Sequence, residues 1–466
     1  MGKLMIAGDR SGSGKTTVTI ALLAALKQQG HSVQAFKVGP DYIDPMFHRA
    51  ITGRPAYNLD PVLTSERYVQ ECFQRYSCAA KYAIVEGVMG LFDGAGGSDW
   101  ASTAHVARLL NCPILLVVDC ARLSRSLAAI VHGYCTLDTR LQIAGVVLNR
   151  VGSDRHLAML TAALNVINVP LLGVLRRESA IALPDRHLGL VPADELPQLP
   201  TQIRQLAQLG KSAFDWPQLT AALTASNTHA VLPIGGGIVE PAPDFQVYPV
   251  RVGIARDRAF NFYYEDNLAL FRRHGAEIVP FSPLIDPHLP VNLDGLILGG
   301  GFPEVFAAAL SQNLAMRTAI AAALAAGLPT YAECGGLMYL CQTIVDFDQR
   351  SWPMVGALPA VATMTGKLTL GYRCATAQQP SSVMTVGQQA WGHEFHRSVI
   401  TPLPPKPIHT LQSYPLPHTA PAAVGAEGWG HEDLHASYVH LHWGGQPALA
   451  QKFLQRCDRF HKQQSS

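Results

Sequence analysis

The sequence has 466 residues, of which 48% are hydrophobic, and its 36 Lys and Arg residues nearly balance 34 Asp and Glu residues. A single hydrophobic core rarely extends beyond roughly 250–300 residues, so two domains are the simplest division of a chain of this length. The near-balance of charge argues against a nucleic-acid or membrane-surface partner, because both usually require a strong basic excess.

Short β-rich runs alternate with longer helical patterns through the first half of the chain. In order, the strand-like runs are KLMIAG, VQAFKVG, YAIVEG, PILLVVD, IAGVVLN and PLLGVL. A helix is expected after the first of them, from Lys15 to about Gly30. Such alternation predicts βαβ units, and therefore a parallel sheet that helices cover on both faces.

The segment GDRSGSGKTT connects the first predicted strand to this helix. In that position, consecutive backbone N–H groups and a helix N-terminus can bind the phosphates of a nucleotide. Gly12 and Gly14 permit the tight turn. Lys15 would contact the β- and γ-phosphates, and Thr16 would ligate Mg²⁺. Asp9 stands where the usual pattern has a glycine, and a flexible turn with an incidental lysine is the alternative interpretation.

Carboxylates follow the next strand-like runs. FKVGPDYIDP supplies Asp41 and Asp44, and VEGVMGLFDG supplies Glu86 and Asp93. Because ligands of open α/β sheets bind beyond the carboxyl ends of the strands, these loops are expected to face the phosphate loop. Mg²⁺ prefers oxygen ligands, which makes these acids candidates to hold it. A helix cap or a solvated turn is the alternative for each acid, and it weighs most for Asp44.

Five motifs, GSGKTTVT, FKVGPDYIDP, EGVMGLFDG, GVVLNRVGSDRH and LPDRHLGL, follow one another in the first half. In this order and spacing they resemble the ATP-dependent amidoligase domain of the cobyrinic acid a,c-diamide synthase family, a domain similar to dethiobiotin synthetase. The resemblance implies that Asp93 lies near the reacting carboxylate and that Asn149 binds adenine, with a strand-end turn as the alternative for Asn149. The implied Mg²⁺ ligands are Thr16, Asp41 and Glu86. The implied nucleotide site comprises Gly12, Gly14, Lys15, Thr16, Thr17 and Asn149.

Between about Ser226 and Pro249 the alternation gives way to Gly, Pro and small polar residues, which is typical of a linker. A second α/β pattern then begins with VRVGIA and continues through AEIVPFS and LDGLILGGG to PTYAEC. We therefore predict an α/β protein of two domains, residues 1–225 and 249–466, joined by a linker at residues 226–248.

The stretch YAECGGLMYL places Cys334 between a predicted strand and two glycines that can open a helix. Glycines there allow a close backbone approach, and a helix N-terminus favours the thiolate form of a cysteine. The earlier strand-end turn LILGGGFPE supplies backbone N–H groups at Gly300 and Gly301 that would form an oxyanion hole. An inert core thiol is the alternative for Cys334, because most cysteines are structural.

A catalytic base is expected in HASYVHLHWGG, which contains His435, His440 and His442. The strand–turn–helix at Cys334, called the cysteine elbow below, and the glycine turn LILGGGFPE together resemble those of a triad-type class I glutamine amidotransferase. That class usually has His-x-Glu at this point, whereas this chain has a second histidine, so the sequence predicts no carboxylate partner. Cobyrinate and cobyric acid synthases share this departure, and their motif places the catalytic base at His440. His442 is the alternative base, and the nearby Glu394 is left outside the predicted catalytic set.

The two halves together predict a ligase that makes its own ammonia. The resemblance implies that glutamine is hydrolysed at Cys334 and that ammonia attacks a carboxylate activated by ATP as an acyl phosphate. The implied substrate is cobyrinic acid, a corrinoid polycarboxylate amidated at its a and c side chains, with ATP as co-substrate and Mg²⁺ as cofactor. Hydrogenobyrinic acid and nickel-sirohydrochlorin are alternative substrates. A cobyric acid synthase or a partition-type nucleotide switch with a silent second half fits the motifs less well.

Nine cysteines are scattered along the chain without a CxxC pair, which predicts reduced and mostly buried thiols. The N-terminus lacks the layout of a signal peptide, and the apolar runs are far shorter than the roughly 20 residues of a membrane helix. We therefore expect a cytoplasmic protein with small-molecule substrates and no membrane or nucleic-acid partner. A homodimer is left open.

Overall fold

The computed structural model describes residues 1–177, 185–186, 189–225 and 246–464. The chain forms two compact units, one of Met1–Pro61 and Ser65–Gly237 and the other of Val62–Thr64 and Ile238–Ser466. Most of the predicted linker, residues 226–248, lies outside the described residues. Within the described ranges, no helix combines the length and the apolar character needed to cross a bilayer.

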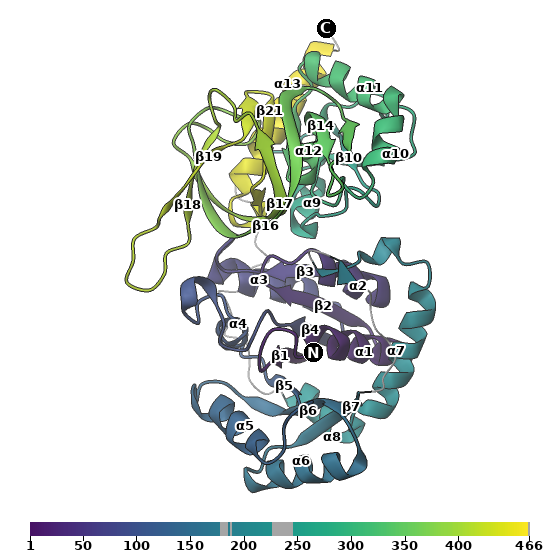
Figure 1. The fold of residues 1–466 in the computed structure, drawn as a ribbon, viewed down its shortest axis with the longest axis vertical. Coiled ribbons are helices and arrows are strands. Elements are labelled where there is room, and N and C mark those ends of the chain that lie inside the picture. Colours follow the sequence, from purple (N-terminus) through teal and green to yellow (C-terminus); the bar gives the residue numbers. More distant parts are fainter. Residues whose placement is uncertain (178–184, 187–188, 226–245, 465–466) are drawn as a thin grey trace. The chain divides into compact units, whose positions relative to one another are not determined.

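The first unit contains a seven-stranded sheet whose pairings are all parallel, in the order β3-β2-β4-β1-β5-β6-β7 (Figure 1). Its strands are β1 (Gly2–Gly8), β2 (Val33–Val38), β3 (Tyr57–Leu59), β4 (Tyr82–Glu86), β5 (Ile114–Asp119), β6 (Ile143–Val151) and β7 (Leu171–Arg176). A short antiparallel pair, β8 (Asp185–Arg186) and β9 (Gly189–Leu190), follows them. The parallel sheet confirms the α/β class that the alternating pattern predicts.

Helices cover both faces of this sheet. They are α1 (Lys15–Gln28), α2 (Ile43–Thr52), α3 (Glu66–Ser77), α4 (Thr103–Leu109), α5 (Ser126–Thr136), α6 (Asp154–Val166), α7 (Leu199–Ala213) and α8 (Trp216–Ala225). The apolar residues of α3 to α6 join the sheet in one buried cluster. Helices α1 and α7 pack against each other outside that cluster, on the opposite face (Figure 1).

The carboxyl ends of the parallel strands bring polar residues to one edge of the sheet. Strand β1 ends at Gly8, directly before the phosphate loop, and β4 ends at Glu86. Strand β5 ends at Asp119, which pairs in register with Asn149 of β6. Residues from separate parts of the sequence therefore meet where ligands of such sheets bind.

The second unit has a central six-stranded sheet in the order β11-β10-β12-β13-β21-β20, parallel except for the edge strand β20. These strands are β10 (Arg251–Ala255), β11 (Glu277–Phe281), β12 (Gly295–Leu298), β13 (Thr330–Glu333), β20 (Trp429–His431) and β21 (Leu434–Ser437). The helices are α9 (Glu265–Arg273), α10 (Ala307–Gln312), α11 (Leu314–Ala325), α12 (Gly335–Leu340) and α13 (Pro447–Gln464). Two buried apolar clusters form its core.

A second, largely antiparallel sheet joins this unit, and the sequence patterns did not predict it. It has the order β15-β14-β16-β17-β22, with β18 and β19 attached beside β16. Its strands are β14 (Cys341–Val345), β15 (Ser351–Pro353), β16 (Leu358–Ala377), β17 (Gln389–Thr401), β18 (His409–Ser413), β19 (Ala423–Glu427) and β22 (His440–Leu441). Strand β22 pairs with β17, which brings His440 opposite His393.

Candidate functional site

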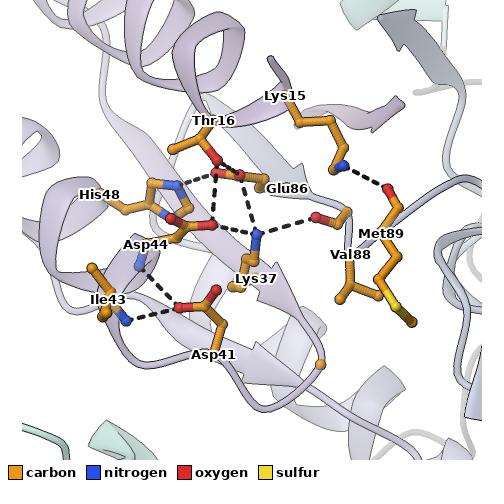
Figure 2. Close-up of polar contacts among 12 residues, drawn as sticks. Lys15, Thr16, Lys37, Asp41, Ile43, Asp44, His48, Glu86, Val88 and Met89 are labelled. Carbon is orange, nitrogen blue, oxygen red and sulfur yellow. Dashed lines mark hydrogen bonds and ion pairs between the residues drawn. The ribbon is translucent and has the colours of Figure 1, made fainter. Parts of the chain in front are cut away.

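The phosphate loop folds around the side chain of Lys15. Gly14 has a φ of 96° directly before α1 and Gly12 has a φ of 75°, so both adopt the left-handed conformation that favours glycine. The Lys15 ammonium donates a hydrogen bond to the Met89 carbonyl at 2.5 Å (Figure 2) and another to the Arg10 carbonyl at 3.4 Å. Burial lowers the pKa of Lys15. The loop thus holds a buried ammonium whose acceptors are backbone carbonyls.

Asn149 braces the phosphate loop from strand β6. Its Nδ2 donates to the Ser13 carbonyl at 2.9 Å, and its Oδ1 accepts from the Arg150 amide at 2.9 Å. A Cβ atom on Gly14 would lie only 2.1 Å from the same Nδ2, and one on Gly8 would lie 2.3 Å from the Ser13 hydroxyl. A side chain at position 8 would therefore fit only if the Ser13 hydroxyl moved. Contact between Asn149 and adenine stays a prediction.

Glu86 is the centre of a buried polar cluster beside the loop (Figure 2). Its Oε1 accepts from the Thr16 hydroxyl at 2.7 Å and from the Lys37 ammonium at 3.1 Å, and its Oε2 lies 2.7 Å from His48 Nε2. Burial raises the pKa of Glu86, but Lys37 and His48 more than offset it, and the pKa is lowered overall. Glu86 is therefore a carboxylate, held at the end of β4 by three donors.

The structure places Asp44, rather than Asp41, within hydrogen-bond reach of this cluster. Asp44 Oδ2 accepts from the Lys37 ammonium at 2.5 Å and lies 3.4 Å from the Thr16 hydroxyl oxygen. Asp41 Oδ1 instead accepts from the backbone amides of Ile43 and Asp44, at 2.8 and 3.1 Å, and caps the start of α2 (Figure 2). Burial and the charge of Asp41 raise the pKa of Asp44. The sequence patterns did not predict Lys37 and His48 in this cluster.

Asp93 and Thr17 complete the predicted residues of the first unit. Asp93 is exposed in the loop after β4, where its Oδ2 accepts from the Gly90 amide at 2.9 Å. A Cβ atom on Gly90 would lie 3.2 Å from the Asp9 carbonyl, so Asp93 stands beside the start of the phosphate loop. Thr17 is half-buried in the first turn of α1.

In the second unit, Cys334 occupies a strained turn between β13 and α12. Its φ of 50° and ψ of −102° are rare for a residue with a side chain and cost on the order of 1–3 kcal/mol. A Cβ atom on Gly336 would lie 2.0 Å from the Leu298 carbonyl, and one on Gly335 would lie 2.9 Å from Pro303. Both positions therefore require glycine. The turn directs the Cys334 sulfur toward β17, where it lies 3.8 Å from the Phe395 carbonyl.

His440 lies beside Cys334 and has a carboxylate partner. Its Nδ1 is 3.6 Å from Oε1 of Glu333, the residue that precedes the cysteine. Burial lowers the pKa of His440, but Cys334 and Glu333 more than offset this effect and raise the pKa from 6.5 to about 10. The expectation that no carboxylate accompanies this histidine is wrong, because the acid comes from β13 rather than from the position two residues after His440.

His442 belongs to a different pair. Its Nε2 lies 3.3 Å from Oδ2 of Asp266, and its Nδ1 accepts from the Gly444 amide at 3.2 Å. Strand β22 ends at Leu441, so the strand-like alternation expected from His440 to His442 stops between them. The two histidines thus have separate acidic partners, and the neighbouring Cys334 raises the pKa of His440.

The two glycines predicted to form an oxyanion hole, Gly300 and Gly301, have different neighbours. A Cβ atom on Gly300 would lie 2.4 Å from Cε1 of His440, so this glycine gives the imidazole its space. The Gly301 amide nitrogen lies beside the cysteine elbow, 3.1 Å from where a Cβ atom on Gly335 would stand. Gly301 also has a φ of 153°. The structure thus places the Gly301 amide next to the turn at Cys334.

Comparisons with known proteins agree with both units. Residues 4–191 match the CobQ/CobB/MinD/ParA nucleotide binding domain, and residues 251–448 match the CobB/CobQ-like glutamine amidotransferase domain. A cobyrinate a,c-diamide synthase of Synechococcus sp. is 56% identical over 98% of this chain and 98% of the relative. One of Synechocystis sp. is 49% identical over 99% and 95%, and a hydrogenobyrinate a,c-diamide synthase of Streptomyces coelicolor is 41% identical over 98% and 97%. The chain therefore belongs to the cobyrinate a,c-diamide synthase family, with a nucleotide-binding domain followed by a glutamine amidotransferase domain.

Proposed function

We propose that this protein uses ATP and glutamine to amidate the a and c side-chain carboxylates of cobyrinic acid, giving cobyrinic acid a,c-diamide. One observation carries the proposal: a phosphate loop with buried carboxylates and a cysteine–histidine–glutamate group occur in one chain, on separate compact units. A ligase that makes its own ammonia requires both. The names of two relatives that are 56% and 49% identical support the substrate.

The domain proposed for residues 1–225 would activate the carboxylate. A carboxylate oxygen attacks the γ-phosphorus of ATP, the bond from that phosphorus to the bridging oxygen breaks, and ADP leaves. Ammonia then attacks the carbonyl carbon of the acyl phosphate and expels phosphate, which is a far better leaving group than oxide. The buried Lys15 ammonium would exchange its carbonyl acceptors for phosphate oxygens. Asp93 would lie beside the reacting carboxylate, and Asn149 beside adenine.

The oxygen atoms around Glu86 are of the hard kind that Mg²⁺ prefers, and the Lys37 ammonium now pairs with two of the carboxylates, so the ion would have to displace or adjoin it. The Thr16 hydroxyl lies 2.7 Å from the Glu86 carboxylate and 3.4 Å from that of Asp44, so three donors converge beside the phosphate loop. Thr16 and Glu86 form the centre of the proposed ligand set, and Asp41 and Asp44 are the carboxylates that would complete it. Bound there with ATP, the ion would neutralise charge on the transferred phosphoryl group.

Glu86→Gln and Asp41→Asn are each expected to raise the Mg²⁺ requirement of amide formation or to lower turnover at least about tenfold, equivalent to about 1.4 kcal/mol of barrier. Both substitutions keep the side-chain volume and remove one negative charge. The measurement is a Mg²⁺ titration of ADP release in the presence of the corrinoid. Glutamine hydrolysis by the second domain serves as the control and should keep its rate. Unchanged Mg²⁺ titrations in both variants would refute this ligand set.

The domain proposed for residues 249–466 would release ammonia from glutamine. The Cys334 sulfur attacks the side-chain amide carbon, and His440 accepts the thiol proton and passes it to the departing ammonia. Backbone N–H groups near Gly300 and Gly301 would stabilise the oxyanion. Water then hydrolyses the thioester, with His440 as base, and glutamate leaves. The packing that keeps Cys334 in its strained backbone conformation would also fix the direction of its sulfur before glutamine binds.

Amidation of cobyrinic acid, hydrogenobyrinic acid and nickel-sirohydrochlorin should be compared side by side by mass spectrometry. We expect the diamide of cobyrinic acid to form with the highest kcat/KM. A higher kcat/KM with one of the other two compounds would assign the protein to that substrate instead, and the 41% identical hydrogenobyrinate relative makes hydrogenobyrinic acid the second candidate. ATP hydrolysis without amide formation on any of the three would favour a nucleotide switch and overturn the proposal.

The proposed reaction needs only small molecules: ATP, glutamine and a corrinoid polycarboxylate. The formal net charge of +2 gives no indication of a nucleic-acid partner. The cysteines of the described chain are free thiols, which suits the reducing cytoplasm where ATP and glutamine are abundant. Measurement of the mass in solution would test for a homodimer.

A further inference from the structure

The buried Glu333 side chain is held in one orientation by two partners. It is the last residue of β13 and is only 4% exposed. One carboxylate oxygen, Oε1, lies 3.6 Å from His440 Nδ1, and the other, Oε2, accepts from the Tyr331 hydroxyl at 2.8 Å. The two oxygens therefore have different partners, and rotation of the carboxylate would break the contact with Tyr331.

Tyr331 is itself fixed by its surroundings. It is two residues before Glu333 on β13, so both side chains leave the strand on the same face. Its ring stacks on His435 with centroids 5.0 Å apart and meets Trp443 edge-on at 4.9 Å. Burial, followed by the charge of Glu333, raises the pKa of Tyr331, so its hydroxyl keeps its proton and remains a donor. A rigid aromatic group thus holds the Glu333 carboxylate in place.

We propose that Glu333 is a positioning residue of the glutaminase, which orients His440 through Nδ1 and stabilises its protonated form next to Cys334. Glu333 would take the part that class I amidotransferases give to the acid two residues after the histidine, a position that His442 occupies in this chain. The inference rests on the proposed function of the second domain and adds an acid from the residue before the nucleophile.

Among the described residues, His393, Gly300 and Cys334 also lie close to His440, and none of these three carries a carboxylate. From β17, His393 faces it across the strand pair, and burial lowers the pKa of His393 to about 3, so that side chain is neutral. From the β12 turn, Gly300 contributes only backbone. The cysteine elbow contributes Cys334, the proposed nucleophile. Of these described neighbours, Glu333 is thus the carboxylate that can hold the imidazolium.

Glu333→Gln tests the inference, because the amide keeps the shape of the side chain and removes its charge. We expect kcat for glutamine hydrolysis to fall at least about tenfold with little change in KM. Without the carboxylate the imidazolium is less stable, so the pKa of His440 falls and the protonated histidine is lost at lower pH. In the pH profile of kcat/KM for glutamine hydrolysis, activity is lost at alkaline pH as His440 loses its proton. This alkaline limb should move from near pH 10 to lower pH by about one unit or more.

Asp266→Asn is the matched control, because it neutralises the buried acid that pairs with His442 instead. It should leave the alkaline limb in place. Glu333→Asp is a second variant. It keeps the negative charge but shortens the side chain by one methylene group, which moves the carboxylate away from His440, and it should show a partial fall in kcat. An unmoved limb in Glu333→Gln, or wild-type kcat in both Glu333 variants, would overturn the inference. Absence of glutaminase activity in the wild-type protein would instead overturn the proposed function.

Discussion

Replacement of Cys334 with alanine is expected to abolish amidation from glutamine and to preserve amidation from ammonium salts. The sulfur is the proposed nucleophile, and its removal leaves His440 and Glu333 with no atom to activate. Activation of the corrinoid carboxylate depends on residues of the other domain, which the substitution does not touch. Amide formation should be followed by mass spectrometry, once with glutamine and once with ammonium chloride at high pH, where more of the salt is free ammonia.

Cys341→Ala is the matched control for this experiment. Cys341 is also buried and directly follows the short helix α12, whereas Cys334 directly precedes it, and the Cys341 sulfur donates to the Leu337 carbonyl. Burial raises the pKa of the Cys341 thiol to about 12, which makes it unreactive near neutral pH. The Cys341 variant should use glutamine as the wild type does. Glutamine-dependent turnover at the wild-type rate in Cys334→Ala would show that the sulfur is not the nucleophile.

The fold of the first unit could be predicted because its signals are local. Buried parallel strands appear as short continuous apolar runs, and glycines such as Gly14 mark the turns between strand and helix. The second, largely antiparallel sheet was missed because its longest strand, β16, continues for 20 residues through polar as well as apolar stretches. Its identity as a strand depends on pairing with β17, which is a long-range contact.

The position of Glu333 could not be derived from spacing alone. Successive residues of a strand point to opposite faces, so the residue before a nucleophile is expected to point away from it. At Cys334 the strand ends and the backbone reverses at a φ of 50°, and this turn lets neighbouring residues approach the same imidazole. Two features of the sequence were signals that could have found it: the acid next to the cysteine and the missing acid after His440.

The two aspartates of FKVGPDYIDP illustrate a second limit. Sequence spacing shows that Asp41 and Asp44 lie in one loop but not which of them caps the helix. The three-residue separation is itself a capping signal, because a cap side chain accepts from an amide about three residues later. The structure uses Asp41 in this way. Lys37 could not be assigned to the acid cluster from sequence, because its burial between Asp44 and Glu86 is a tertiary contact.

Lys15→Ala is expected to abolish amide formation from either glutamine or ammonium salts while glutamine hydrolysis persists. The Lys15 ammonium is buried at the start of α1, and in the proposed reaction it neutralises phosphate oxygens as charge shifts toward ADP. Loss of one such group typically costs on the order of 10²–10³ in rate. The substitution removes two hydrogen bonds to backbone carbonyls, each worth about 1 kcal/mol, so the domain should remain folded. ADP, glutamate and corrinoid amide should be measured in the same reaction.

Lys27→Ala is the matched control, because Lys27 lies in the last turn of the same helix and its side chain is exposed. It removes the same charge from α1 at the end remote from the phosphate loop and should leave ADP and amide formation unchanged. Glutamate release in Lys15→Ala then reports whether the second domain is intact. Full synthetase activity in Lys15→Ala would exclude this lysine from the phosphate site. Equal losses in both lysine variants would indicate that the helix, rather than the position of the ammonium, is what the reaction requires.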